Sequence, residues 1–171
     1  MEYPSQGEYH NQGEYYHQED HYQEDHHQKY HKQAYPAISD YGPDPLVFQL
    51  GYVTSRNRNF RTTLWTGQHM QLTLMCIPVG GEIGLESHPE TDQFIGIESG
   101  KARVYMGSSK NNLHDRTYVN ENSAILIPAG TWHNIVNTGT CPLKLYSIYA
   151  PPQHPFGTVH HTKEEAEHEE Y

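Results

Sequence analysis

The chain has little cysteine and no long apolar run, and both shortages restrict what it can be. Its two cysteines, Cys76 and Cys141, each lie in a mostly apolar, strand-like segment, so we expect buried free thiols and no disulfide. No segment approaches the ~20 apolar residues that span a bilayer, and the N-terminus has no apolar run of signal-peptide length. We therefore expect a cytoplasmic protein with no membrane partner.

An excess of basic residues is also missing. The net charge of the chain is -10, distributed as -5 over residues 1–35, -1 over residues 36–160 and -4 over residues 161–171. The middle segment has eight Lys or Arg against nine Asp or Glu, so it offers no basic face to a phosphate backbone. Nucleic acid is therefore not an expected partner.

Residues 1–35 have almost no aliphatic side chains. Only Met1 and Ala34 carry aliphatic side chains, and QGEY recurs at positions 6 and 12 and QED at positions 18 and 23. Such a low-complexity segment cannot bury enough apolar surface to offset the entropy of ordering, so we expect a disordered tail. Residues 36–45, rich in proline, are expected to form a linker, and the acidic residues 161–171 a frayed or weakly helical tail.

The remaining residues, 46–160, are expected to form one domain. Short apolar runs alternate with turn signals about every ten residues, and no long helical period is present, which is typical of an all-β sandwich or barrel. The expected strands cover residues 46–53, 63–65, 70–79, 83–88, 93–98, 102–106, 116–119, 123–127, 133–137 and 143–149.

Two polar clusters interrupt this apolar pattern. In the first, Glu86 and His88 are two residues apart, so a strand would place both side chains on the same face, and a turn then brings Gln93 back on the next strand. The second places His133 just after a Pro-Ala-Gly turn. We expect these four side chains to converge.

The two clusters resemble the two sequence motifs of the cupin superfamily, G-x5-H-x-H-x(3,4)-E-x6-G and G-x5-P-x-G-x2-H-x3-N. Seven of the ten fixed positions match and every spacing holds. The first motif begins at Gly80 and ends at Gly100, and the leading Gly of the second is replaced by Asn122. The other matching positions of the second motif are Pro128, Gly130, His133 and Asn137.

The resemblance implies a single cupin barrel, a double-stranded β-helix or jelly roll, with a divalent metal at its mouth. Cupins commonly bind this metal through three His and one Glu. Here Glu86 replaces the first His and Gln93 replaces the Glu, so the set becomes Glu86, His88, Gln93 and His133. Two imidazoles, one carboxylate and one amide oxygen suit Mn(II), Fe(II) or Ni(II), with Zn(II) as a further option.

Other side chains are weaker candidates. Arg61 and Arg103 have the chemistry to grip an anionic substrate, but we expect them to be solvated charges. The closing segment, residues 149–167, is expected to pack over the barrel mouth, as in small bacterial cupins that resemble sugar-phosphate isomerases. Four aromatic residues are interpreted mainly as core: Trp65, Trp132, Tyr146 and Tyr149.

The resemblance implies a metal-binding cupin that binds or acts on a small polar molecule, such as a sugar or sugar phosphate, in an isomerase-type or dioxygenase-type reaction. It also implies a homodimer. The alternative is a non-catalytic structural cupin, because the seven Tyr and six His of residues 1–35 resemble low-complexity segments of bacterial spore coat proteins. In that case the tail would bind coat-protein partners and place the chain in the spore coat, or bind zinc or nickel loosely.

Overall fold

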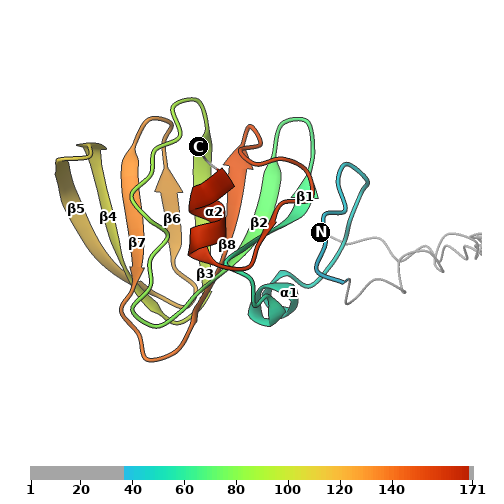
Figure 1. The fold of residues 1–171 in the computed structure, drawn as a ribbon, viewed down its shortest axis with the longest axis horizontal. Helices are drawn as coiled ribbons and strands as arrows, with labels where there is room; N and C mark the ends of the chain where they lie inside the picture. Colours follow the sequence, from blue (N-terminus) through green and yellow to red (C-terminus); the bar gives the residue numbers. More distant parts are fainter. Residues whose placement is uncertain (1–36, 170–171) are drawn as a thin grey trace, which may run out of the picture. The chain divides into compact units, whose positions relative to one another are not determined.

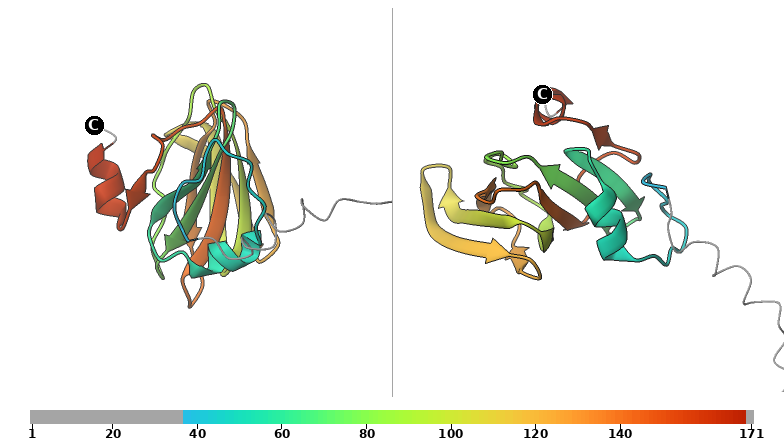
Figure 2. Two further views of the ribbon diagram at one scale, coloured as in Figure 1. Left: turned by 90° about the vertical axis from the view of Figure 1, so that its right-hand side faces the viewer. Right: turned by 90° about the horizontal axis from the view of Figure 1, so that it is seen from below.

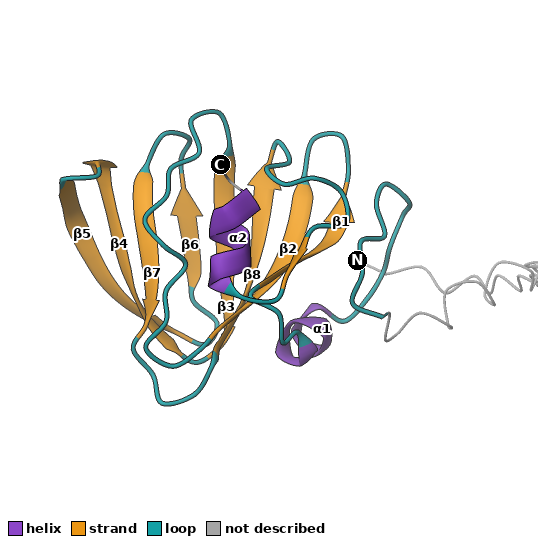
Figure 3. Ribbon diagram, in the orientation of Figure 1, coloured by secondary structure: helices purple, strands orange, loops and turns teal. Residues whose placement is uncertain are grey.

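A computed structural model of the chain describes residues 37–169 (Figure 1). The expected disorder of residues 1–35 lies outside the described residues. Figure 3 shows that the regular structure of the described residues is mainly β-strand, with two short helices. The all-β fold class expected from the sequence is confirmed.

The strands follow the expected order along the chain. Their bounds are β1 (Arg61–Thr66), β2 (Gln71–Ile77), β3 (Asp92–Ser99), β4 (Lys101–Ser109), β5 (Asn112–Asn120), β6 (Ala124–Ile127), β7 (Trp132–Asn137), β8 (Leu143–Ala150) and β9 (Val159–His160). They form a six-stranded sheet in the order β6-β3-β8-β2-β1-β9 and a three-stranded sheet in the order β5-β4-β7. Every pair of neighbours is antiparallel.

The main core lies between the two sheets. Burial alternates along β7, so that His133, Ile135 and Asn137 face inward, as the two-residue period of a strand requires. Ile135 is fully buried and belongs to the same apolar cluster as Ile95 and Leu145 of the larger sheet. Burying side chains of this size stabilises the fold by roughly 1.5–3 kcal/mol each.

The expected strand at residues 46–53 is wrong. Residues 50–56 form helix α1 (Leu50–Arg56) instead, with Val53 and Thr54 buried and the Thr54 hydroxyl donating to the Leu50 carbonyl at 2.8 Å. A short apolar run does not distinguish a strand from a buried helical turn. In this case packing of Val53 and Leu50 against the outer face of the six-stranded sheet decides for the helix.

Residues 83–88 also do not form the expected strand. Gly84 has a φ of +112°, which breaks the extended backbone, and the segment pairs with β7 only through isolated bridges at Glu82 and Glu86. The functional expectation survives this correction, because the Glu86 amide donates to the His133 carbonyl at 3.0 Å and the His133 amide donates to the Glu86 carbonyl at 2.9 Å.

Residues 37–45, expected as a linker, lie against β1. The Tyr41 amide donates to the Leu64 carbonyl at 2.9 Å, and the Trp65 indole donates to the Asp44 carbonyl at 2.7 Å. The Asp40 carboxylate accepts hydrogen bonds from the Thr66 hydroxyl at 2.6 Å and from the backbone amides of Gly42 and Gly157 at 3.0 and 3.1 Å. This stretch therefore covers one face of the six-stranded sheet.

The acidic C-terminal segment contains helix α2 (Lys163–Glu169), consistent with the weakly helical expectation. Ala166 of this helix is buried in the main core, and Lys163 forms an ion pair with Glu82 at 3.0 Å. The side views in Figure 2 show α2 outside the two sheets and away from α1. The buried methyl group of Ala166 and the ion pair of Lys163 with Glu82 thus connect the helix to the rest of the fold.

The expectation of two buried thiols is half wrong. Both cysteines are free, as predicted, but Cys141 is exposed and Cys76 is only partly buried. Cys141 lies in the turn between β7 and β8, and connecting turns of this kind run over the protein surface. Among residues 37–169, no helix has the length and apolar character that crossing a bilayer requires.

Candidate metal centre

Glu86, His88 and His133 converge in one cluster. The Glu86 Oε1 atom lies 3.4 Å from His88 Nε2 and 3.3 Å from His133 Nε2, and the three donor atoms all lie within 4.8 Å of one another. His133 is fully buried and His88 nearly so. Donor atoms at this spacing can all reach a single ion, because metal-ligand bonds to N and O are ~2.0–2.2 Å long.

The backbone fixes the positions of these side chains. The paired hydrogen bonds between Glu86 and His133 lock the two residues opposite each other, and the Gly130 amide donates to the His88 carbonyl at 2.8 Å. Gly130 has a φ of +78° at the turn before β7, a conformation that favours glycine. This turn therefore presents His133 to the loop that carries Glu86 and His88.

The orientation of the His133 ring is set by a further contact. Its Nδ1 lies 2.9 Å from the Thr131 carbonyl, which accepts a hydrogen bond only if Nδ1 carries the proton. In that tautomer the Nε2 lone pair is free and faces Glu86 and His88. Such a second hydrogen bond is typical of histidines that bind metals.

Gln93, the fourth expected ligand, is buried on β3. Its amide nitrogen donates to the Ser147 hydroxyl at 2.9 Å, which leaves its Oε1 atom without a hydrogen-bond partner among the described residues. Gln93 pairs in register with Tyr149 of β8, and the Tyr149 ring contacts the His88 ring edge-on at 5.5 Å between centroids. Gln93 is thus connected to the cluster through Tyr149, and its role as a ligand stays a prediction.

The cluster keeps Glu86 ionised. Burial opposes the charged form, but protons on the imidazole nitrogens of His133 and His88 and the positive charge of Arg61 outweigh it, so without a bound metal the pKa of Glu86 lies far below its ordinary range. Arg61 Nη2 is 3.9 Å from Glu86 Oε2. The expectation that Arg61 is a solvated charge is wrong, because its side chain is only 2% exposed and lies beside the cluster.

These residues fit a divalent metal ion. Within the described part of the chain, four buried atoms lack a hydrogen bond at the place where the family motif puts its ligands: Glu86 Oε1, His88 Nε2, Gln93 Oε1 and His133 Nε2. Leaving a buried polar atom unpaired costs roughly 1–3 kcal/mol. A bound ion would satisfy the atoms of Glu86, His88 and His133 at once, with no thiolate in the set, which is the donor chemistry of Mn(II), Fe(II), Ni(II) or Zn(II).

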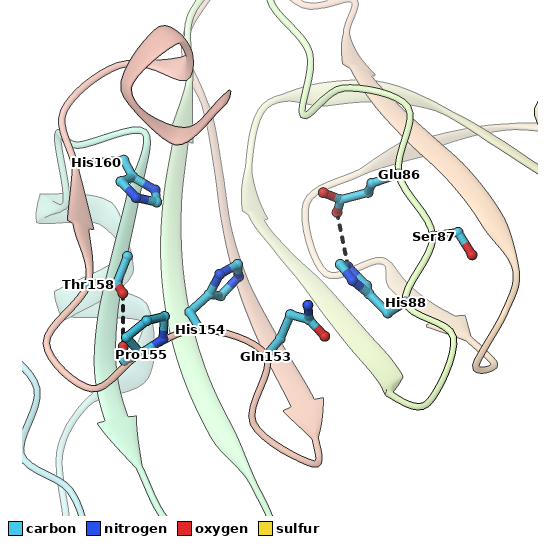
Figure 4. Close-up of a pocket in the computed structure, with 8 residues that line it drawn as sticks. All are labelled: Glu86, Ser87, His88, Gln153, His154, Pro155, Thr158 and His160. Carbon is cyan, nitrogen blue, oxygen red and sulfur yellow. Dashed lines mark hydrogen bonds and ion pairs between the residues drawn. The ribbon is translucent and has the colours of Figure 1, made fainter. Parts of the chain in front are cut away.

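A cavity of about 410 Å³ adjoins the cluster. Residues 86–88 line one side, and the closing segment lines the other through five residues between 153 and 160 (Figure 4). The expectation that this segment packs over the barrel mouth is therefore confirmed. A space of this size is typical of small-molecule sites.

His154 is a residue of this cavity that the sequence did not single out. Its ring also contacts the Tyr149 ring edge-on, at 5.2 Å between centroids, and its Nε2 is buried. Burial and then the charge of Arg61 lower the pKa of His154 to about 3, so the imidazole is neutral at physiological pH. It lies in an irregular segment, PPQHPFG, where no periodicity tells which side chains point inward.

The other candidates lie elsewhere. Arg103 stacks over Tyr105 and Tyr118, at 5.2 and 5.1 Å from the ring centroids, and takes no part in the cluster. Trp65 and Tyr146 pack in the second apolar cluster beside α1, as expected of core residues. Tyr149 is both fully buried and part of the site, because its ring contacts both His88 and His154.

Comparison with known families and proteins agrees with this geometry. A family model described as a cupin domain matches residues 73–149. A solved structure, BH2720 from Bacillus halodurans, superposes with a TM-score of 0.76 at 58% identity, over 77% of this chain and 99% of that one. A Klebsiella pneumoniae protein with a double-stranded β-helix domain has a TM-score of 0.53 at 18% identity, over 70% and 100% of the two chains, which shows the fold alone.

Two curated relatives are uncharacterized proteins. The chain is 57% identical to YrkC of Bacillus subtilis over 129 residues, which is 75% of this chain and 69% of YrkC. It is 43% identical to L612 of Acanthamoeba polyphaga mimivirus over 107 residues, 62% of this chain and 65% of L612. The sequence motifs, the two antiparallel sheets and these relatives agree: the chain belongs to the cupin family.

Proposed function

We propose that the chain is a metal-dependent cupin that binds a small oxygen-rich molecule in the cavity beside Glu86, His88 and His133. The observation that carries the proposal is the convergence of three donor atoms, from Glu86, His88 and His133, within 4.8 Å of one another next to that cavity. A bound divalent metal supplies a Lewis acid that polarises the oxygen atoms of the ligand. Gln93 is the fourth donor or orients a water molecule.

The protein's own residues give the site its polarity. Glu86 contributes one negative charge and Arg61, next to it, one positive charge, so the two offset each other. The charge of a divalent ion would then be left to attract a ligand. The cavity wall contains no Lys or Arg among the described residues. A neutral or anionic molecule rich in hydroxyl groups, such as a sugar or sugar phosphate, is the ligand class that suits such a site.

Two reaction types suit this donor set, isomerisation of a sugar or sugar phosphate and dioxygenase-type oxidation. The cavity supports isomerisation, because it holds a neutral imidazole, His154, that can donate a hydrogen bond to a hydroxyl group of a sugar or accept one from it. An oxygen electrode separates the two types. Isomerisation of a panel of aldoses and their phosphates consumes no oxygen, and oxidation consumes it in proportion to product.

Metal analysis of the purified full-length protein tests the proposal. We expect about one equivalent of a divalent transition metal more in the wild type than in a variant that lacks the three donors, Glu86→Ala/His88→Ala/His133→Ala. The comparison uses the full chain because the six histidines of residues 1–35 are present in both proteins and contribute equally.

The matched control removes two exposed histidines outside the cluster, His69→Ala/His114→Ala. This variant should retain the metal of the wild type. Equal metal content in the wild type and the triple variant would refute the proposed site.

A second function rests on a separate feature, the Tyr- and His-rich residues 1–35. We propose as the alternative that the cupin is a structural component of a bacterial spore coat, joined to coat proteins through this tail. Two of the relatives come from Bacillus species, which supports a bacterial setting. A fluorescent fusion that lacks residues 1–35 should lose the location of the full chain in sporulating cells. An unchanged location would contradict the coat role.

A further inference from the structure

The closing segment forms the wall of the cavity that faces the metal cluster. Figure 4 shows the imidazoles of His154 and His160 across the cavity from Glu86 and His88. These residues lie beyond the two cupin motifs in the sequence. The cavity thus has one side made by the motif residues and another made by a segment with its own polar groups.

Gln71 of β2, a buried side chain, fixes the closing segment at residues 153 and 154. The Gln71 amide nitrogen donates to the His154 carbonyl at 2.8 Å, and its oxygen accepts from the His154 amide at 2.9 Å and the Gln153 amide at 3.3 Å. Further along, the Gly157 amide donates to Asp40 at 3.1 Å. The backbone on both sides of the His154 ring is therefore fixed before any ligand binds.

The His154 ring is fixed as well. It packs edge-on against Tyr149, whose ring also contacts His88. The Nε2 atom of His154 is buried and has no hydrogen-bond partner among the described residues. With its pKa lowered to about 3, mainly by burial, the ring is a neutral group able to donate or accept one hydrogen bond. An oriented polar atom that lacks a partner is a binding group for a ligand.

We propose that His154 is the specificity residue of this cavity, and that its Nε2 forms a hydrogen bond with a hydroxyl group of a ligand whose other end lies at Glu86, His88 and His133. This inference rests on the proposed function, since it requires a ligand at the metal cluster. Both imidazoles contact the Tyr149 ring, at 5.5 and 5.2 Å between centroids, and both line the same cavity, so one small ligand can touch the two groups.

The ligand class follows from the groups that surround the space. A positively charged ligand is disfavoured beside a bound cation and the buried Arg61. A purely apolar ligand would leave His154 Nε2 unpaired, at the cost of a buried polar group. The site therefore selects a short polyhydroxylated acid or sugar.

Tartrate and succinate provide a direct test, because both are four-carbon dicarboxylates and only tartrate carries hydroxyl groups. Full-length protein loaded with Co(II) is titrated with each, and binding is followed in the visible spectrum of the cobalt. We expect tartrate to bind the wild type more tightly than succinate. In His154→Phe, which retains an aromatic ring against Tyr149, this preference should fall ~10-fold, the size expected for one hydrogen bond.

Cobalt affinity and thermal stability of His154→Phe should equal those of the wild type, since His154 is not a metal ligand. His154→Gln, which offers an amide in place of the ring nitrogen, should restore part of the tartrate preference, and the exposed control His114→Phe should leave it unchanged. An equal preference for tartrate over succinate in His154→Phe and the wild type, or no such preference in the wild type, overturns the proposed role of His154 and leaves the proposed function standing. Failure of the wild type to bind cobalt in the cluster overturns the proposed function and this inference with it.

Discussion

At the scale of single residues, the candidate site differs from the cupin motif in the position of its carboxylate. The carboxylate that the family motif places on β3 is an amide here, Gln93, and a carboxylate stands at Glu86 in the preceding loop. Arg61, the first residue of β1, lies 3.9 Å from that carboxylate. A buried carboxylate needs such a partner, because an isolated charge is costly to remove from water.

Replacing Gln93 by Glu tests whether this residue is a ligand. In Gln93→Glu a second carboxylate faces the cation, and the Ser147 hydroxyl can reverse its hydrogen bond and donate to the new oxygen. We expect the dissociation constant for Mn(II) to fall ~10-fold or more, measured by isothermal titration calorimetry. Gln93→Leu should weaken binding instead. Identical affinities in all three proteins would show that Gln93 is not a ligand.

The sequence predicted this part of the site well and its surroundings poorly. Glu86, His88 and His133 were identified because motif spacing is a local property of the chain. Arg61 was named only as a weak candidate expected to be solvated, and His154 was not named, because each comes to the site from a distant segment, β1 and the closing segment. Which way their side chains point depends on packing that no short pattern encodes.

At the scale of elements, the cavity depends on segments outside the two sheets. Residues 37–45 pack on β1 and hold the closing segment through Asp40, and α2 follows directly after β9. Sequence reasoning located most strands, since their apolar alternation is strong, but it assigned α1 as a strand. The run LVFQLGYV suits both structures, and only its contacts with the sheet decide.

Asp40 gives these connections a pH dependence. Partial burial raises its pKa, but hydrogen bonds from Thr66, Gly157 and Gly42 outweigh this and lower the pKa below the ordinary range of an aspartate. Its stabilising effect is therefore complete above the pKa of the unfolded chain and is lost as the pH falls through the folded pKa. We expect Asp40→Asn to cost about 1 kcal/mol at pH 7 and less at pH 3, measured by urea denaturation.

The matched control for Asp40 is Asp44→Asn, since the Asp44 side chain is exposed and only its backbone carbonyl is used in the fold. This variant should unfold at the same urea concentration as the wild type at both pH values. A constant difference between Asp40→Asn and the wild type from pH 7 to pH 3 would contradict the assignment to the carboxylate.

Helix α2 provides a second prediction at this scale. Ala166 is 3% exposed and packs in the main core, so Ala166→Asp would bury a carboxylate without a partner. We expect a loss of at least about 2 kcal/mol in the free energy of unfolding. His168→Asp introduces the same residue on the exposed side of the helix and should change stability by less than about 0.5 kcal/mol. Equal effects of the two substitutions would mean that α2 does not pack on the core in solution.

At the scale of the whole molecule, the fold leaves strand β6 at the edge of the six-stranded sheet. Leu126 of this strand is 72% exposed, and unpaired edges with apolar side chains are places where sheets associate. We expect a homodimer through this edge, so light scattering on a gel-filtration column should give twice the chain mass of 19.7 kDa. Leu126→Lys should give the monomer mass, and a monomeric wild type would contradict the expectation.

The most direct test of the account is a crystal structure of the full chain purified without added metal, with anomalous scattering data to identify any ion. We predict one transition-metal ion about 2.0–2.3 Å from Glu86 Oε1, His88 Nε2 and His133 Nε2, with an open position toward the cavity. The same atoms bonded only to water or to one another, with no anomalous signal between them after soaking in Mn(II), would contradict it.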